Sequence, residues 1–303
     1  MRVLVAGATG VIGRQLVPLL EDAGHDVVAL SRTSPNSATR HDVVVADALD
    51  RDATSSAVDK AAPDAVIHLL TAIPKRINPK RLATQFAGTN QLRTIGTRNL
   101  FDAARAARAS RIIAQGLAYG YQPAGAGLAD EDTPFWTDGP KQFRPVAAAL
   151  VEHERLTQEA GGLVLRFGHL YGPGSIYAPD GDFTHQVRSG KVPLVAGGES
   201  VFSFTHAFDA ASAIVAALDS PTTGALNIVD NNPTPMRAWL PEMAELLHAP
   251  APKKVPAWLA RAAVGSWGVA FMSSLRGANN SRALSRLDWT PTYPSWQQGF
   301  NPG

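Results

Sequence analysis

The fold of this 303-residue chain is decided near its beginning, by the stretch RVLVAGATGVIG at residues 2–13. Val3–Ala6 form an apolar run of strand length, and three glycines follow with the spacing Gly-x-x-Gly-x-x-Gly. That spacing allows a tight turn, brings the backbone close to a pyrophosphate and packs the next helix against the strand. The helix N-terminus then offers free N–H groups to phosphate. The stretch predicts a dinucleotide-binding unit; the alternative is a glycine turn that only packs the helix.

Short apolar runs alternate with helical patterns through the first half of the chain. The runs are rich in β-branched residues and nearly continuous, which is typical of parallel strands covered on both faces. This alternation predicts an α/β fold, a Rossmann-type doubly wound parallel sheet with right-handed crossovers. We expect strands at Val3–Ala6, Val27–Leu30, Val43–Val45, Ala65–Leu70, Ile112–Ala114 and Leu163–Phe167, and helices at Val11–Ala23, Arg51–Ala61, about Arg81–Ala109 and Ala147–Ala160.

The alternation weakens after about residue 170. Isolated patterns remain there: helices at Asp209–Leu218 and Met236–Leu247, a strand at Leu226–Val229 and a proline-rich end. We interpret this half as a small C-terminal substrate lobe on the carboxyl edge of the sheet. The expected division is a dinucleotide-binding Rossmann domain at 1–170, to which parts of 200–230 return, and a small substrate-binding lobe at 171–303.

The composition removes several classes of chemistry. The chain has no cysteine, which excludes disulfides, thiolate nucleophiles and cysteine-ligated metals and fits a cytoplasmic protein. Its eight histidines include no His-x-x-x-His pair, so no metal site is expected. A Ser-His-Asp hydrolase is equally unsupported, because no Gly-x-Ser-x-Gly elbow follows a strand. The chemistry must therefore use other side chains or a bound cofactor.

The formal net charge is only +2, from 28 basic and 26 acidic residues. Between residues 75 and 111, however, nine Lys or Arg accompany one acid, Asp102. Because only two aromatic residues, Phe86 and Phe101, lie there, we interpret this run as a solvated helix face near a phosphate-bearing cofactor. No signal peptide is expected, and the longest apolar stretch, Val255–Leu275, is interrupted by Arg261, which predicts packed helices instead of a membrane span.

The end of the second predicted strand indicates which dinucleotide binds. An NAD site carries an acid about 20 residues past the glycines, whereas a nearby Arg accommodates a 2′-phosphate. Ser31 and Arg32 stand there and Arg14 adds a cation, which favours NADP(H) over NAD(H); the alternative for Arg32 is a solvated loop residue. Asp47 is placed to accept from the adenine amino group, while Asp50 resembles a helix N-cap. The remaining expected cofactor contacts are Gly7, Thr9, Gly10, Val11, Ile12, Gly13 and Ala48.

A further set of motifs runs in order along nearly the whole chain. It comprises the glycine turn, Asp47, His68–Ala72, Thr89-Asn90, Gly96–Leu100, Leu165-Arg166, Tyr171–Gly174, Phe204–Asp209, Asn227-Ile228 and Leu287–Pro291. Together these motifs resemble the NAD-dependent epimerase/dehydratase family, the extended branch of the short-chain dehydrogenase/reductases. The resemblance implies that Leu69, Leu70 and Thr71 line the cofactor. It also implies that Asn90 lies near the active site and that Gly168 and His169 lie beside the nicotinamide.

The chain departs from this family at the catalytic residues. The family uses a Ser or Thr after the fifth strand and a Tyr-x-x-x-Lys on the next helix, where the Tyr exchanges a proton with the substrate. Here the hydroxyl position holds Gly116, or Gln115 if the register slips by one. Anchored on Glu154, the helix has Val146 at the Tyr position and Leu150 at the Lys position. The chain therefore resembles atypical members of the family.

Three side chains are candidates to replace the missing acid and base. Tyr119 and Tyr121 follow the fifth strand, and their alternative role is packing of the loop. His169 follows the sixth strand, and histidine titrates near neutrality. We interpret His153 as a surface residue of its helix and His206 as structural.

The sequence favours an NADP(H)-dependent oxidoreductase or an epimerase/dehydratase-type enzyme with non-standard acid/base residues. Its substrate would be a small, mostly apolar organic molecule, such as a secondary metabolite, because the second half is rich in aromatic residues. Two alternatives stay open: a redox-neutral, cofactor-assisted cyclase or isomerase, and a non-catalytic NADP(H) sensor. We expect no nucleic-acid or membrane partner. The oligomeric state stays open; the resemblance implies that a homodimer would form through the helices that begin near Arg81 and Ala147.

Overall fold

The computed structural model describes residues 1–34 and 39–300 and contains a seven-stranded parallel sheet in the order β11-β6-β5-β4-β1-β2-β3. The strand order reverses beside β1, as in a doubly wound fold, so the predicted Rossmann-type α/β class is confirmed. The strands are β1 (Arg2–Ala6), β2 (Asp26–Ser31), β3 (Asp42–Val45), β4 (Ala65–His68), β5 (Arg111–Leu117), β6 (Leu163–Phe167) and β11 (Gly224–Ile228).

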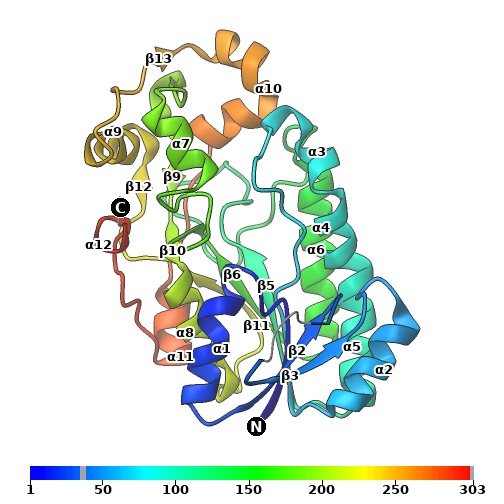
Figure 1. The fold of residues 1–303 in the computed structure, drawn as a ribbon. Coiled ribbons are helices and arrows are strands. Elements are labelled where there is room, and N and C mark those ends of the chain that lie inside the picture. The colour runs from blue at the N-terminus through cyan, green and yellow to red at the C-terminus, as the bar shows by residue number, and fades with distance from the viewer. Residues whose placement is uncertain (35–38, 301–303) are drawn as a thin grey trace.

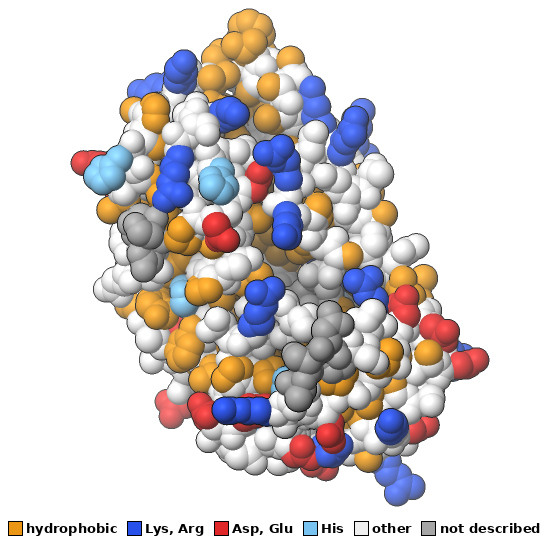
Figure 2. Space-filling view, in the orientation of Figure 1, with side chains coloured by type: hydrophobic (Ala, Val, Ile, Leu, Met, Phe, Trp, Pro, Cys, Tyr) orange, Lys and Arg blue, Asp and Glu red, His pale blue; other side chains and the backbone are white. Residues whose placement is uncertain are grey.

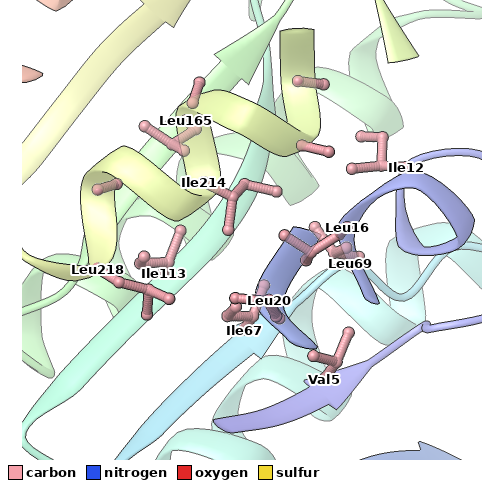
Figure 3. Packing of buried hydrophobic residues seen from close by; sticks show 14 of the residues in the cluster. Val5, Ile12, Leu16, Leu20, Ile67, Leu69, Ile113, Leu165, Ile214 and Leu218 are labelled. Atoms are coloured by element: carbon pink, nitrogen blue, oxygen red, sulfur yellow. The ribbon is translucent and has the colours of Figure 1, made fainter. Parts of the chain in front are cut away.

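Helices cover both faces of this sheet (Figure 1). Alternate residues of β1 explain this, because Val5 packs into one apolar cluster and Leu4 into the other. On the first face, Leu16 and Ile214 meet side chains of the central strands (Figure 3). The helices of the first face are α1 (Gly13–Asp22), α8 (Ala207–Leu218) and α11 (Ser281–Leu287); those of the second are α2 (Arg51–Ala61), α5 (Thr97–Ala106) and α6 (Arg144–Glu159).

The segment that precedes β5 is not the single helix that its pattern predicts. It is broken at Phe86, whose ψ of 4° is not helical, and it contains a π-helical turn, η2 (Leu92–Gly96). A π-turn rotates the side chains that it carries relative to a regular helix and is frequent at functional sites. The pieces before it are η1 (Pro79–Arg81), α3 (Leu82–Gln85) and α4 (Ala87–Gln91), and α5 follows it directly.

The lobe above the carboxyl ends of the strands is built around aromatic side chains (Figure 1). Trp239, Phe202 and Phe204 lie at its centre and are almost completely buried. Within the described residues no helix is long and apolar enough to cross a membrane. The lobe contains the paired short strands β7 (His169–Tyr171) with β10 (Phe204–His206), β8 (Leu194–Val195) with β13 (Lys254–Val255), and β9 (Val201–Phe202) with β12 (Thr234–Pro235), together with α7 (Asp182–Arg188), η3 (Ala196–Gly198), α9 (Met236–Leu246), α10 (Ala257–Ser273) and α12 (Trp296–Gly299).

Candidate functional site

The glycine turn between β1 and α1 has the shape that a pyrophosphate requires. Gly7 has a φ of +104°, which favours glycine, and its carbonyl accepts from the Gly10 N–H at 3.1 Å. A Cβ on Gly13 would lie 2.3 Å from the Gly7 carbonyl oxygen, and one on Gly7 would lie 2.9 Å from the Leu69 backbone. No side chain caps the first turn of α1. The turn and the helix end therefore fit a dinucleotide pyrophosphate.

Two arginines are available at the adenosine side of this turn. Arg32, at the end of β2, is exposed and makes no ion pair within residues 1–34 and 39–300. Arg14 is also exposed, and its Nε donates to the Thr9 carbonyl at 2.7 Å. Ser31 lies before Arg32, and its hydroxyl accepts from the Thr33 N–H at 3.3 Å. These positions agree with a 2′-phosphate site, although the preference for NADP(H) stays a prediction.

Asp47 and Asp50 have different roles at the start of α2. The Asp50 carboxylate accepts from the Ala53 N–H at 3.0 Å and is the N-cap, as predicted. The Asp47 carboxylate instead accepts from the Leu49 N–H at 3.0 Å, and Ala48 beside it is buried. Asp47 is thus free of the capping role and is exposed after β3, where an adenine contact remains a prediction.

The other residues that the resemblance placed at the cofactor lie along the same edge of the sheet. The Leu69 N–H donates to the Ala6 carbonyl at 2.8 Å, Leu70 is half-buried and Thr71 is exposed. Gly168 donates its N–H to the Thr205 hydroxyl, and a Cβ there would lie 2.2 Å from the Ser203 carbonyl oxygen. Packing alone therefore requires a glycine at position 168, whatever its contact with a cofactor.

The positions of the missing Tyr and Lys on α6 are filled by the apolar core. Val146 and Leu150 are both buried and pack in a cluster with Phe143 and Trp267, whose rings stack at 4.1 Å. A side chain at Gly116 would clash, since its Cβ would lie 2.6 Å from Val164. The structure therefore supplies no hydroxyl, phenol or amine at the positions that the family pattern uses.

Tyr121 is held inside a buried polar network. Its hydroxyl donates to Asn227 Oδ1 and accepts from Arg166 Nη1 at 3.1 Å. Arg166 also forms a two-bond ion pair with Glu154 at 2.7 and 2.6 Å. Burial raises the pKa of Tyr121 well above its usual value. This tyrosine thus ties the loop after β5 to β6 and β11, which is the packing role that we gave as its alternative.

Tyr119 and His169 stack on each other at the carboxyl ends of the strands. Their ring centroids are 4.2 Å apart, and the other face of His169 stacks on Phe202 at 3.9 Å. Burial lowers the pKa of His169 to about 3 and raises the pKa of Tyr119 to about 12. The imidazole is therefore neutral at physiological pH, and its buried Nε2 has no hydrogen-bond partner in the part of the chain that the structure describes. Near pH 7 the phenol of Tyr119 stays protonated and the imidazole of His169 stays neutral, so neither side chain is suited to ordinary acid catalysis.

The prediction that His153 lies on the surface of its helix is wrong, because it is 1% exposed and belongs to a buried relay. Its Nε2 donates to the Gln115 carbonyl at 3.0 Å, so its Nδ1 accepts from the Thr97 hydroxyl at 2.7 Å. His68 accepts from the Leu70 N–H at Nδ1 and donates from Nε2 to Thr97 at 3.0 Å. Burial lowers the pKa of both histidines, that of His68 to about 4. In both histidines the ring proton is therefore on Nε2, and the hydroxyl proton of Thr97 points to Nδ1 of His153.

The interpretation of the basic run at 75–111 as a solvated face is wrong at two positions. Arg111 is buried, and its guanidinium donates to the carbonyls of Ala217 at 2.9 Å and Thr222 at 2.8 Å. Arg93, on η2, is 6% exposed and makes no ion pair or hydrogen bond within the described residues. Sequence analysis missed Arg93; its spacing of three from Asn90 on one helical face was the available signal.

Two further predictions concern the role of His206 and the binding of metal ions. His206 is structural, as predicted, because its ring accepts from the Phe208 N–H at the start of α8. In the described part of the chain, no group of three His, Asp or Glu side chains is arranged to hold a metal ion.

Figure 2 shows a recess near the centre of this face of the molecule, with apolar side chains inside and basic ones around it.

Comparison with known proteins identifies the family of this chain and several similar proteins. The model of the NAD dependent epimerase/dehydratase family matches residues 3–229. A 3-diazoavenalumate denitrifying reductase from a Streptomyces species is 47% identical over 303 residues, 99% of each chain. A ceramide reductase from Caulobacter vibrioides is 27% identical, over 98% of this chain and 88% of that protein. A dTDP-glucose 4,6-dehydratase double mutant from Streptomyces venezuelae, solved with NAD, has a TM-score of 0.77 at 18% identity, over 100% of this chain and 95% of that one.

Proposed function

The chain belongs to the NAD dependent epimerase/dehydratase family, and from this premise we propose that it is an NADP(H)-dependent reductase of aromatic diazonium compounds. The relative that is 47% identical along its whole length is named as a denitrifying reductase of a diazo compound, which supports this substrate class. An arenediazonium is the natural choice within that class, because alkyl diazonium ions lose dinitrogen without a catalyst.

One observation carries the proposal: the site has no group suited to donate a proton. Reduction of a carbonyl produces an alkoxide, which requires a proton from a neighbouring acid. Here the Tyr and Lys positions hold the buried Val146 and Leu150, and the hydroxyl of Tyr121 is fixed between Asn227 and Arg166. A site of this kind suits an acceptor whose reduction consumes no proton.

A diazonium ion is such an acceptor. The bound nicotinamide would supply a hydride, so that the carbon–nitrogen bond breaks, a carbon–hydrogen bond forms, dinitrogen leaves with the bonding pair, and the dihydronicotinamide is oxidised. The side chains of this protein then have to bind and orient. The glycine turn and the α1 N-terminus would hold the pyrophosphate, and Arg32 with Arg14 the 2′-phosphate. The half-buried ring of Tyr119, which His169 supports from one side, offers a flat, neutral surface to an aromatic ring.

The proposal is tested with 4-carboxybenzenediazonium and NADPH that carries deuterium at C4. We expect enzyme-dependent loss of the dihydronicotinamide absorbance, release of one dinitrogen for each NADPH, and benzoate that carries the deuterium at the position of the lost nitrogen. A reaction without protein corrects for direct reduction by NADPH. Gly13→Val serves as the control variant, because its Cβ would lie 2.3 Å from the Gly7 carbonyl oxygen and would distort the turn that is to hold the pyrophosphate.

Ketones, enones and sugar nucleotides form the competing panel. Faster NADPH consumption with any of these than with the diazonium ion would refute the proposed substrate class. Tight NADPH binding with no enzyme-dependent consumption by any compound would instead favour the non-catalytic sensor. Deuterium from solvent water in the product would mean that a proton donor takes part, against the observation on which the proposal rests.

A further inference from the structure

The buried guanidinium of Arg93 has no anion to pair with. The side chain is 6% exposed, and its buried Nη1 makes no hydrogen bond within residues 1–34 and 39–300. Burial lowers its pKa to about 10, so it still carries its charge at neutral pH. An unpaired buried charge is strongly destabilising. A fold that keeps such a charge in a functional cleft commonly does so for a ligand of opposite sign.

Its neighbours place Arg93 at the centre of the candidate site. The charge of Arg93 acts on Tyr119, which follows β5, on His68 at the end of β4, and on His153 of α6. These groups face it from the strand ends and from the helix that packs against η2, and all of them are neutral near pH 7. The buried acid of α6, Glu154, is occupied by Arg166. The protein therefore leaves this positive charge uncompensated.

A second unpartnered polar atom lies on the same helical face. Asn90 precedes Arg93 by three residues, which brings the two side chains to one side of the helix, and its buried Oδ1 has no hydrogen-bond partner among the described residues. The buried Nε2 of His169 is also without one. A set of unused donors and acceptors at the carboxyl end of a parallel sheet indicates a polar ligand group at this place.

We propose that Arg93 binds a carboxylate of the substrate and so makes the enzyme selective for aromatic acids. The planar guanidinium matches a carboxylate through two parallel hydrogen bonds. The phosphates of a dinucleotide are accounted for elsewhere, at the glycine turn after β1. The phenol of Tyr119 is close enough to the guanidinium to interact with its charge, so an arene that carries an acid would meet both an aromatic ring and the cation. This proposal depends on the proposed function in one respect only, which is the identity of the reacting group that the arene carries.

Binding of cinnamate and its uncharged isostere cinnamamide tests this proposal without any turnover. Both are titrated by calorimetry into the protein saturated with NADPH. We expect cinnamate to bind at least about tenfold more tightly than cinnamamide, and Arg93→Gln to remove this difference. Arg98→Gln is the matched control, because Arg98 lies one turn further on, is exposed and pairs with Glu152. It should leave the preference unchanged, and Arg93→Lys should restore part of it.

The stability of the protein without ligand provides a second readout. Because Arg93 has no partner, Arg93→Met should raise the midpoint of thermal unfolding, whereas a structural role for the guanidinium would require a decrease. A decrease, or an equal affinity of the wild type for cinnamate and cinnamamide, would overturn the proposal. Turnover separates it from the proposed function. Arg93→Gln should raise KM for 4-carboxybenzenediazonium but not for 4-carbamoylbenzenediazonium. If neither compound is reduced while cinnamate still depends on Arg93, only the proposed function fails.

Discussion

At the scale of single residues, we predict that Arg32 determines how strongly the protein distinguishes the two nicotinamide dinucleotides. It is exposed after β2 and has no carboxylate partner in the described structure, so its charge is available to a 2′-phosphate. We expect Arg32→Ser to weaken NADPH binding about tenfold, a typical loss for one charge-assisted hydrogen bond, and to leave NADH binding nearly unchanged. Fluorescence titration with each dinucleotide measures both effects.

Arg51→Ser is the control for this prediction, because Arg51 is exposed at the start of α2 and makes only a long contact of 4.0 Å with Asp102. The control should bind both dinucleotides like the wild type. Equal losses for NADPH and NADH in Arg32→Ser would contradict the assignment of this side chain to the 2′-phosphate.

At the scale of elements, the relay of His68, Thr97 and His153 joins β4, α5 and α6 and makes stability depend on pH. Burial holds the pKa of His68 at about 4, below its usual 6.5, so the unfolded chain binds the additional proton first as the pH falls. Stability is therefore full above pH 6.5 and is lost between 6.5 and about 4. For His68 the loss is at most about 3 kcal/mol, at 1.36 kcal/mol per pH unit.

His68→Gln isolates this contribution. Asp230, whose pKa burial raises to about 7, acts in the opposite direction in wild type and variant alike, so it cancels in their difference. We expect the variant to be less stable than the wild type at pH 8 and the gap to narrow toward pH 4.5. Urea unfolding at a series of pH values measures the gap, and a constant gap would mean that His68 is not the titrating group.

Elements with strong local patterns were predicted well, whereas those shaped by distant contacts were not. The ranges of α2 and β6 match their predictions residue for residue, because an N-cap or an apolar run specifies them locally. The single helix predicted from about Arg81 was wrong, since the break at Phe86 and the π-turn occur where the segment packs against α6. His153 was misplaced for a similar reason. Its partner Thr97 lies 56 positions away.

The candidate site divides in the same way between what one segment encodes and what several segments assemble. The glycine turn is encoded in seven successive residues, and the structure has the strand, turn and helix that they predict. Arg93 is buried among groups from the end of β4, the loop after β5 and α6, which a single segment does not reveal. A run of basic residues looks solvated until the fold shows which of them point inward.

At the scale of the whole molecule, the C-terminal segment packs on the face of the sheet that α1 and α8 cover, and so joins the two halves of the chain. Trp289 is buried in the first apolar cluster, and its Nε1 donates to Ser212 of α8 at 3.0 Å. The Asp209 carboxylate accepts from the backbone N–H groups of Thr292 and Tyr293 at 2.8 and 3.0 Å. The division at residue 170 stays a prediction, but the cluster that holds Trp289 also contains Leu16 of α1, so residues on both sides of that division share one core and we expect the two parts to unfold together.

Trp289→Ala tests this coupling in the full chain. Removal of a buried tryptophan should cost about 3–5 kcal/mol, mainly through the cavity that it leaves. Trp289 packs in the apolar cluster of the sheet and not in the lobe. If the two parts unfolded independently, the substitution would lower the stability of the sheet and leave the lobe around Trp239 unchanged. We expect instead that far-ultraviolet circular dichroism and the fluorescence of the remaining tryptophans shift to one lower, common midpoint. Two separate midpoints would show that the lobe folds independently and that the C-terminal return does not couple it to the sheet.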